Sequence, residues 1–255
     1  MSDDISLAER LICAEANDVP LPAPSPAPTV EQAYAIQRAI FARRMMPTMV
    51  WKLGLTGEGP RAALGSTDPV VGRLPASAIY LDRSEVSLFG TEMYGEAEIV
   101  LEFGADLPPR DTPYEAVEVA MAIKGVYAGI ELATTRFESS DLSLGNLIAD
   151  NCLGYGLVLG DRLHDGWLDT FADLPVTMTR AGHPPEPGST SRAMGSPLAA
   201  ATWLANWLGA NETGIQREQL IATGSCAGIT RLFAGDVVTA RFAGRWQASI
   251  TILNQ

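Results

Sequence analysis

One stretch of alternating residues, from Gly95 to Gly104, most constrains how this chain can fold. In its sequence GEAEIVLEFG, apolar side chains occupy every second position, and Glu96, Glu98 and Glu102 fall between them. Successive side chains of a β-strand point to opposite faces, so the pattern predicts a half-buried strand. The second face of that strand carries Glu96 and Glu98 side by side.

The pair Glu96 and Glu98 admits two interpretations. Adjacent carboxylates repel each other and raise each other's pKa, and a hard divalent cation such as Mg2+ or Mn2+ removes that cost because it prefers oxygen ligands. The alternative is an acidic strand face in contact with solvent, where charged side chains are usually found. This stretch alone favours the solvated face and leaves the metal site as the competing hypothesis.

Lysine is rare in this chain. Of the 18 basic residues only Lys52 and Lys124 are lysines. A lysine can lose its proton at accessible pH, whereas an arginine cannot. Lys52 also interrupts the apolar segment MVWKLGLTG, which makes it a candidate acid or base. There are two alternatives. The two lysines have no special role in a sequence whose other basic residues are all arginine, or Lys52 extends its charged end to the surface.

Composition narrows the possible partners. The net charge of -12 and the isoelectric point near 4.6 argue against nucleic acid as a binding partner. No apolar run approaches the roughly 20 residues of a membrane span, and the acidic start MSDDISLAER is unlike a signal peptide, so we expect a cytoplasmic protein with no membrane partner. Cys13, Cys152 and Cys226 lack metal-type spacing and are expected to be reduced thiols.

The beginning of the chain is expected to be helical. Asp3 to Asn17 carries apolar residues at helical spacing, and the proline-rich run VPLPAPSPAPTV that follows predicts an extended connector. Thr29 then precedes a second amphipathic segment, VEQAYAIQRAIFARRMM. We expect residues 1–48 to form a helical N-terminal region with this connector, and residues 49–255 to form the main domain.

Strands outnumber helices after residue 85 and do not alternate regularly with them, which predicts an α+β fold with a mixed, mainly antiparallel sheet. Further strands are expected at GVYAGIELA, LPVTMTR, QLIATG, DVVTARFAG and WQASITILN. Helices are expected from Pro113 and after Ser196, an N-cap residue followed by proline. The segment Gly54 to Gly72 predicts a loop with one helical turn, and His164 and His183 are expected on the surface.

Several motifs, taken in order, resemble a known family. They are WKLGLT, ALGSTDPVVGRL, GEAEIVLEFGADLP, AGIELATTRF, IADN, GSPLAAATWLANWL, ATG and AGD. They are similar to segments of the 2-oxopent-4-enoate hydratase and 4-oxalocrotonate decarboxylase group of the fumarylacetoacetate hydrolase superfamily, from about Val30 to Thr251. The resemblance implies a mixed β-sandwich roll with a helical N-terminal portion, homo-oligomers, and association with a related pathway enzyme.

The resemblance also implies a metal centre and its chemistry. Glu96, Glu98 and Glu131 would hold Mg2+ (or Mn2+), which would chelate a small-molecule 2-oxo acid and stabilise its dienolate. Lys52 would be the acid or base, with a pKa lowered by burial and reset by the metal and carboxylates. With this order of motifs the metal site becomes the favoured interpretation of the glutamates.

Other implied site residues surround the substrate. They are the catalytic candidates Arg136 and Asp150, and the substrate-binding candidates Leu53, Asn151, Thr223 and Gly224. The chain departs from the group at Val70, where hydratases usually carry an acid and decarboxylases an apolar residue. It also departs at Leu153, which replaces a small polar residue.

The resemblance leaves four possible functions. Hydration of a 2-hydroxypenta-2,4-dienoate is the first expectation. Decarboxylation of 4-oxalocrotonate is the alternative that Val70 favours, and it calls for a cation or hydrogen-bond donors near the distal carboxylate, which the sequence does not single out. Carbon-carbon hydrolysis of an acylpyruvate is disfavoured because neither His164 nor His183 lies in a matching motif. An inactive accessory subunit comes last because all three glutamates are present.

Overall fold

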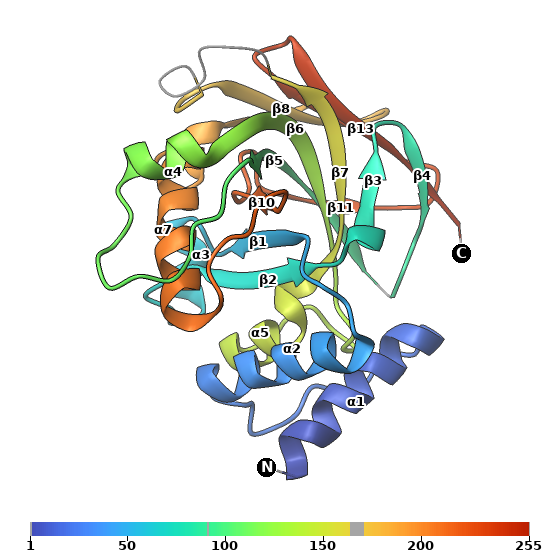
Figure 1. Ribbon diagram of the computed structural model, residues 1–255. Helices are drawn as coiled ribbons and strands as arrows, with labels where there is room; N and C mark the ends of the chain where they lie inside the picture. The colour runs from blue at the N-terminus through green and yellow to red at the C-terminus, as the bar shows by residue number, and fades with distance from the viewer. Residues whose placement is uncertain (1, 91, 164–170, 255) are drawn as a thin grey trace.

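The computed structural model describes residues 2–90, 92–163 and 171–254, with side chains from residue 7 onward. In these residues the strands form two curled sheets, and helices lie at one end and along one side (Figure 1). Most strand pairs are antiparallel. Three pairs are parallel: β1 (Val50–Gly54) with β10 (Leu220–Ala222), β3 (Ile79–Leu81) with β7 (Gly154–Arg162), and β4 (Ser84–Ser87) with β13 (Trp246–Leu253). The predicted α+β fold with mixed, mainly antiparallel sheets is therefore confirmed.

The larger sheet carries the acidic strand in its centre. In sheet order its strands are β2 (Val70–Leu74), β1 (Val50–Gly54), β10 (Leu220–Ala222), β5 (Met93–Phe103), β6 (Ile123–Thr134), β7 (Gly154–Arg162) and β3 (Ile79–Leu81), and β11 (Ile229–Leu232) pairs with β5 beyond β10. The alternation that predicts β5 has its physical basis in burial, because Ala97, Ile99 and Phe103 are fully buried in the core. This core fixes β5 beside β6 over eleven paired positions.

The smaller sheet packs across the far side of this core. In sheet order its strands are β4 (Ser84–Ser87), β13 (Trp246–Leu253), β12 (Val237–Phe242), β8 (Pro175–Arg180) and β9 (Glu186–Ser189). Buried Val238, Ala240 and Phe242 alternate along β12, as expected for a strand with one face in the core.

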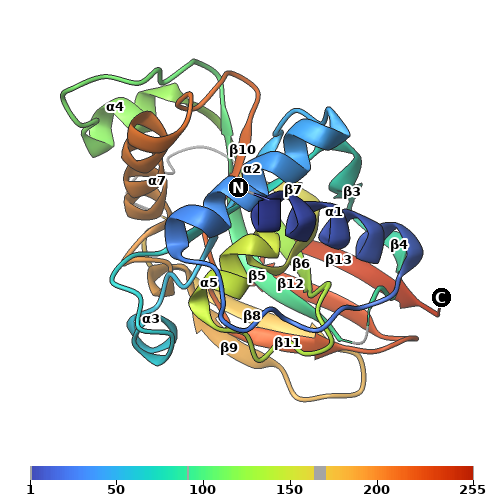
Figure 2. The same ribbon diagram turned by 90° about the horizontal axis from the view of Figure 1, so that it is seen from below.

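Helices α1 (Ser2–Asn17) and α2 (Val30–Arg44) cross the end of the molecule next to α5 (Leu144–Ala149), as seen from below in Figure 2. Thr29 caps α2 through a capping box with Gln32. Buried Leu11 and Ile36 belong to the same apolar core as β5. Helices α4 (Ala116–Ala122) and α7 (Pro197–Asn211) contact each other on the side of the molecule.

Two sequence-based expectations need correction. Within Gly54–Gly72 the expected helical turn is present as α3 (Glu58–Ala63), but the end of this segment belongs to strand β2 and not to a loop, because it pairs with β1. The helix expected from Pro113 begins later, at Ala116, because Glu115 and Glu118 form its capping box. His183 is exposed, as expected, and His164 lies outside the described residues.

No helix in the described part of the chain is long and apolar enough to cross a membrane.

Candidate active site

Three glutamates meet at the centre of the larger sheet. Glu96 on β5 lies directly opposite Glu131 on β6, and Glu98 lies opposite Gly129. One carboxylate oxygen of each glutamate lies within 4.8 Å of those of the other two. Glu98 and Glu131 are fully buried, so the solvated-face interpretation is wrong.

These carboxylates have unused hydrogen-bonding capacity. Glu98 Oε2 accepts a hydrogen bond of 2.8 Å from the Gly224 backbone N–H, whereas Glu98 Oε1 and Glu131 Oε2 have no hydrogen-bond partner among the described residues. Buried charged oxygens without partners are costly. A hard divalent cation fits this all-oxygen set, because it would satisfy those atoms and offset the repulsion between the carboxylates.

The electrostatics of the cluster agree with this fit. Burial, with the neighbouring Glu131 carboxylate, raises the pKa of Glu96 to about 7. The same two causes, with the charge of Glu96 added, hold the pKa of Glu98 well above its ordinary value. Burial and mutual repulsion therefore favour the protonated forms of Glu96 and Glu98 unless a cation lies beside them.

Lys52 supplies one positive charge to the cluster. It is 2% exposed, and its Nζ lies 2.6 Å from Glu131 Oε1 and donates a 2.9 Å hydrogen bond to the Cys152 carbonyl. Burial lowers the pKa of Lys52, as expected, but the carboxylates of Glu131 and Glu96 outweigh burial and hold it above its ordinary value. A cation bound to those carboxylates would reduce this effect.

Gly72 makes room for the Lys52 side chain. It lies opposite Lys52 in the β1–β2 pairing. A Cβ atom on Gly72 would lie 2.7 Å from Lys52 Cδ and 2.7 Å from the Asn151 carbonyl oxygen, closer than real contacts allow. The lysine therefore reaches Glu131 only because residue 72 is glycine.

The Cys152 carbonyl, the second partner of Lys52, lies in a strained backbone segment. Asn151, Cys152 and Leu153 have φ values of 55°, 53° and 63°, in the left-handed region that non-glycine residues seldom occupy. The Asn151 side chain accepts from the Arg73 N–H (2.9 Å) and donates to the Arg73 carbonyl (2.8 Å). This clamp holds the turn that presents the Cys152 carbonyl to Lys52.

The main cavity, of about 580 Å³, reaches the carboxylate cluster at Glu96. Its charged lining residues within the described ranges are Lys52, Glu96 and Arg192. The other walls are largely apolar, formed in part by Leu53, Leu55, Val70, Leu147, Leu153 and Ile229. Of the substrate-binding candidates, Leu53 therefore faces this cavity, and Val70 forms part of its wall.

Arg136, Asp150 and Asn151 line a different space, the second cavity, of about 190 Å³ beneath α1 and α2. Arg136 Nε pairs with Glu15 of α1 at 2.9 Å, and Asp150 Oδ2 accepts hydrogen bonds from the Thr135 hydroxyl and the Arg136 N–H. Burial raises the pKa of Asp150 to about 6, against the charge of Arg136. The structure thus brings these three candidates together behind the lysine rather than around the main cavity.

Thr223 and Gly224 lie beside the carboxylate cluster. The buried Thr223 hydroxyl donates to the Ile99 carbonyl at 2.9 Å, and the Gly224 N–H is the donor to Glu98. Gly224 has φ +104°, and a Cβ there would collide with Thr56. In the structure both residues fix β10 and the Glu98 carboxylate.

Arg192 is a cavity residue that the sequence does not single out. It lies in the short helix η3 (Thr190–Arg192), within a stretch whose polar residues give no periodic signal. Ser225 also lines the cavity, and its hydroxyl donates a hydrogen bond of 2.7 Å to the Gly228 carbonyl. Only the three-dimensional arrangement reveals that these residues share one space.

No family model matches the chain. Individual curated proteins do: a 2-keto-4-pentenoate hydratase of Paraburkholderia phymatum is 30% identical over 260 residues, which cover 96% of each protein. A 4-oxalocrotonate decarboxylase of a Pseudomonas species is 28% identical over 81% of this chain and 80% of that protein.

Solved structures agree with these relatives. The structure of 4-oxalocrotonate decarboxylase from Pseudomonas putida, complexed with magnesium and adipate, matches with a TM-score of 0.89 over 99% of this chain and 98% of that chain, at 25% identity. Fumarylpyruvate hydrolase from Pseudomonas aeruginosa, in complex with Mn2+ and pyruvate, shares the fold at a TM-score of 0.63 and 14% identity, over 82% of this chain and 91% of that chain. The chain is therefore an enzyme of the 2-keto-4-pentenoate hydratase and 4-oxalocrotonate decarboxylase group, and its fold is that of the fumarylacetoacetate hydrolases.

Proposed function

We propose that this protein is a Mg2+- or Mn2+-dependent lyase that hydrates a 2-hydroxy-2,4-dienoate by way of its 2-oxo form. The observation that carries the proposal is the contact between Lys52 and a cluster of three buried carboxylates at the base of an otherwise apolar cavity. The hydratase relative, aligned over 96% of both proteins, supports the same reaction.

Each residue of the site has a defined task in this proposal. Glu96, Glu98 and Glu131 would hold the cation, which when bound supplies Lewis-acid polarisation of a 2-oxo acid. Lys52 carries three N–H donors, of which one faces the Glu131 carboxylate and one is bonded to the Cys152 carbonyl. The remaining N–H is available to the substrate, so Lys52 is placed to give and take the proton that moves along the conjugated chain.

The apolar wall has a separate effect. Leu53, Leu147 and Ile229 surround the part of the cavity above the charged cluster. They would hold the hydrocarbon part of the substrate and keep bulk water from the lysine. A low-dielectric site strengthens the interaction of Lys52 with the charge that develops on the substrate.

The first experiment follows the ultraviolet absorbance of 2-hydroxypenta-2,4-dienoate, the simplest substrate of this class. Purified protein in Mg2+ should remove the signal rapidly, and excess chelator should abolish the loss. A stable signal with Mg2+ present would contradict the hydratase proposal.

Decarboxylation of a 2-oxo-enedioate is the second candidate. Val70 lines the main cavity, so an apolar side chain stands at the position where hydratases usually carry an acid. The decarboxylase from Pseudomonas putida matches nearly the whole chain, and its complex holds adipate, a dicarboxylate. Release of CO2 from 4-oxalocrotonate, without hydration of the dienoate, would make decarboxylation the reaction of this enzyme.

We also propose that the enzyme is a cytoplasmic homo-oligomer, possessing a surface suited to self-association. Val117 and Met121 on α4 are 59% and 83% exposed, which leaves apolar area that a second copy would cover. Light scattering coupled to gel filtration should give a mass above the 27.1 kDa of one chain. A monomer at micromolar concentration would contradict this part of the proposal.

A further inference from the structure

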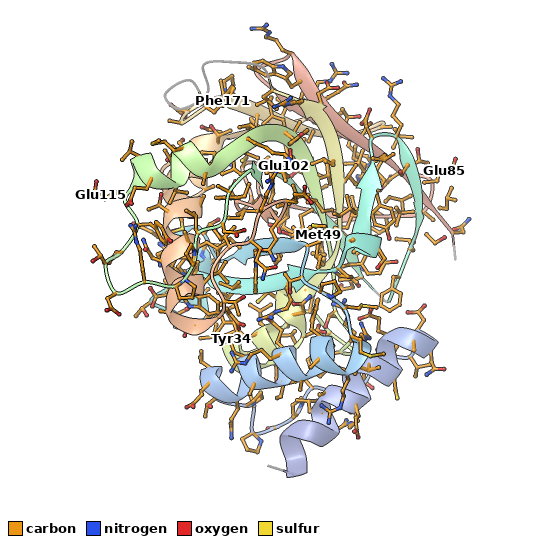
Figure 3. The ribbon with its side chains drawn as sticks, in the orientation of Figure 1. Tyr34, Met49, Glu85, Glu102, Glu115 and Phe171 are labelled. Carbon is orange, nitrogen blue, oxygen red and sulfur yellow. The ribbon has the colours of Figure 1, made fainter. Side chains whose placement is uncertain are left out.

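The second cavity is bounded by elements that are fixed to one another. Its walls come from α1 and α2 on one side, and from β2 and the turn after α5 on the other. The hydroxyl of Tyr34 on α2, labelled in Figure 3, accepts from the Val71 N–H at 3.0 Å, and the Gln37 amide donates to the Val71 carbonyl at 3.0 Å. Leu11 anchors α1 in the apolar core. The space is therefore held open by contacts on both sides.

Guanidinium groups gather around this space. In a chain of net charge -12, the cavity is lined by three arginines, Arg44, Arg73 and Arg136, and by two carboxylates, Glu15 and Asp150. A cavity with more guanidiniums than carboxylates attracts anions rather than cations.

Arg44 is the arginine with donors to spare. Its Nη1 pairs with Glu15 Oε1 at 2.9 Å, and the other oxygen of Glu15 pairs with Arg136 Nε at 2.9 Å. No other hydrogen bond joins the Arg44 side chain to the described residues, so most of its five N–H donors remain available. The side chain is 20% exposed, and a molecule entering from solvent can therefore reach it.

The other two arginines are engaged more fully. Arg136 donates to the carbonyls of Thr134 and Gly154 as well as to Glu15. Arg73 pairs with Glu212, which does not line the cavity. Arg44 is therefore the group to which an anion would bind.

The size and the remaining walls of the cavity indicate what that anion carries. A cavity of about 150 Å³ is enough for a benzene molecule, and this space is about 190 Å³. Much of its wall is apolar, formed by Leu11, Ile40, Phe41, Met46, Leu74 and Ala78. A carboxylate attached to one six-membered ring, or to a short alkyl chain, matches this combination of size, charge and apolar surface.

We propose that the second cavity is an effector site for a small monocarboxylate with an apolar body, whose carboxylate pairs with Arg44. A guanidinium matches a carboxylate with two parallel N–H donors. The apolar body would lie against Asn151 and Gly154, on the outer side of the strained turn. It would add contacts to the turn that presents the Cys152 carbonyl to Lys52, and so stabilise the position of the lysine. The effect on Lys52 rests on the proposed function, whereas the binding itself does not.

The test compares benzoate with benzamide, which has the same shape but no charge, and neither carries a 2-oxo group. Calorimetry is done in Mg2+ with the main cavity saturated by 2-oxopentanoate, a non-reacting 2-oxo acid. Benzoate should bind the unmodified enzyme one to one with a Kd on the order of 1 mM or below, and benzamide about 10-fold or more weakly. Arg44→Gln should weaken benzoate binding about 10-fold or more, and Arg44→Lys should retain part of it.

The matched control is Arg43→Gln. Arg43 is the neighbouring residue on α2, pairs with Glu9 at 3.6 Å and does not line the cavity. This variant should bind benzoate as the unmodified enzyme does. Absence of benzoate binding to the unmodified enzyme, or equal binding to Arg44→Gln, would overturn the site.

The effect on the reaction is measured with the dienoate substrate. Benzoate should raise kcat about 2-fold or more with KM unchanged, and Arg44→Gln should remove the increase. Competitive inhibition, or an unchanged kcat with benzoate bound, would overturn the effector role. Failure of 2-oxopentanoate to bind in Mg2+ would overturn the proposed function, while benzoate binding that depends on Arg44 would still establish the second site.

Discussion

At the scale of single residues, the site depends on which glutamate of a strand is buried. Glu98 and Glu102 occupy the same face of β5, yet Glu98 is fully buried in the carboxylate cluster, while Glu102 is half-buried and pairs with Lys124 at 2.9 Å. The side chains are the same, so the difference between them comes entirely from their surroundings.

This contrast gives a test of the metal centre. Glu98→Gln removes one charged ligand, and we expect Mg2+ affinity to fall at least 10-fold, measured by calorimetry. Glu102→Gln is the control on the same strand and should bind Mg2+ as the unmodified protein does. Unchanged affinity in Glu98→Gln would mean that the cluster is not the metal site.

The two lysines offer a second matched pair. The Lys52 side chain is buried beside Glu131. Lys52→Met keeps the length of this side chain but removes the ammonium group that carries the proton, so kcat should fall about 100-fold or more. Lys124→Met alters only a surface pair with Glu102 and should retain nearly full kcat. Full turnover by Lys52→Met would reduce Lys52 to a packing residue.

At the scale of secondary-structure elements, the position of the lysine depends on the close approach of β2 and the left-handed turn at Asn151. Gly72→Ala would push the Lys52 side chain from Glu131, because no space exists for the added methyl group. We expect a kcat loss of about 10-fold or more with Mg2+ affinity within about 3-fold of normal.

The control for this change is Gly59→Ala, since a Cβ on Gly59 in α3 meets nothing within 4 Å. It should keep full activity. Equal kcat in both variants would show that the approach of β2 does not position the lysine.

The same elements show how far the sequence alone can predict the structure. The alternation in β5 is a local property and predicts the strand directly, whereas β11 is four residues long and exists because it pairs with β5. The motifs of the resemblance identify the three glutamates and Lys52. Arg192 has no local signal, because its place at the cavity results from the packing of β9 against the loop at Cys226.

At the scale of the whole molecule, the buried carboxylates couple metal binding to stability. The pKa of Glu96 is raised to about 7 and that of Asp150 to about 6, so between about pH 4 and pH 7 these two carboxyl groups bind more protons in the folded protein than in the unfolded chain. Its free energy of unfolding therefore falls as pH rises through that window.

Calorimetric melting in chelator should accordingly show a lower midpoint at pH 7.5 than at pH 5.5, by on the order of 5 °C. Mg2+ should raise the midpoint more at pH 7.5, because the cation competes with protons for the same oxygens. An equal effect of Mg2+ at the two pH values would contradict the link between these carboxylates and the metal.

The segment Asp150–Leu153 separates the main cavity from the second cavity by the thickness of a single backbone. On one side Cys152 and Leu153 face the main cavity, and on the other Asp150 and Asn151 face the space closed by α1. Through Glu15, helix α1 therefore supports this segment from the side that faces away from the main cavity. The N-terminal region is therefore part of the working enzyme. A shortened chain without it would keep every side chain that lines the main cavity, but it would lose the support of the segment that positions Lys52.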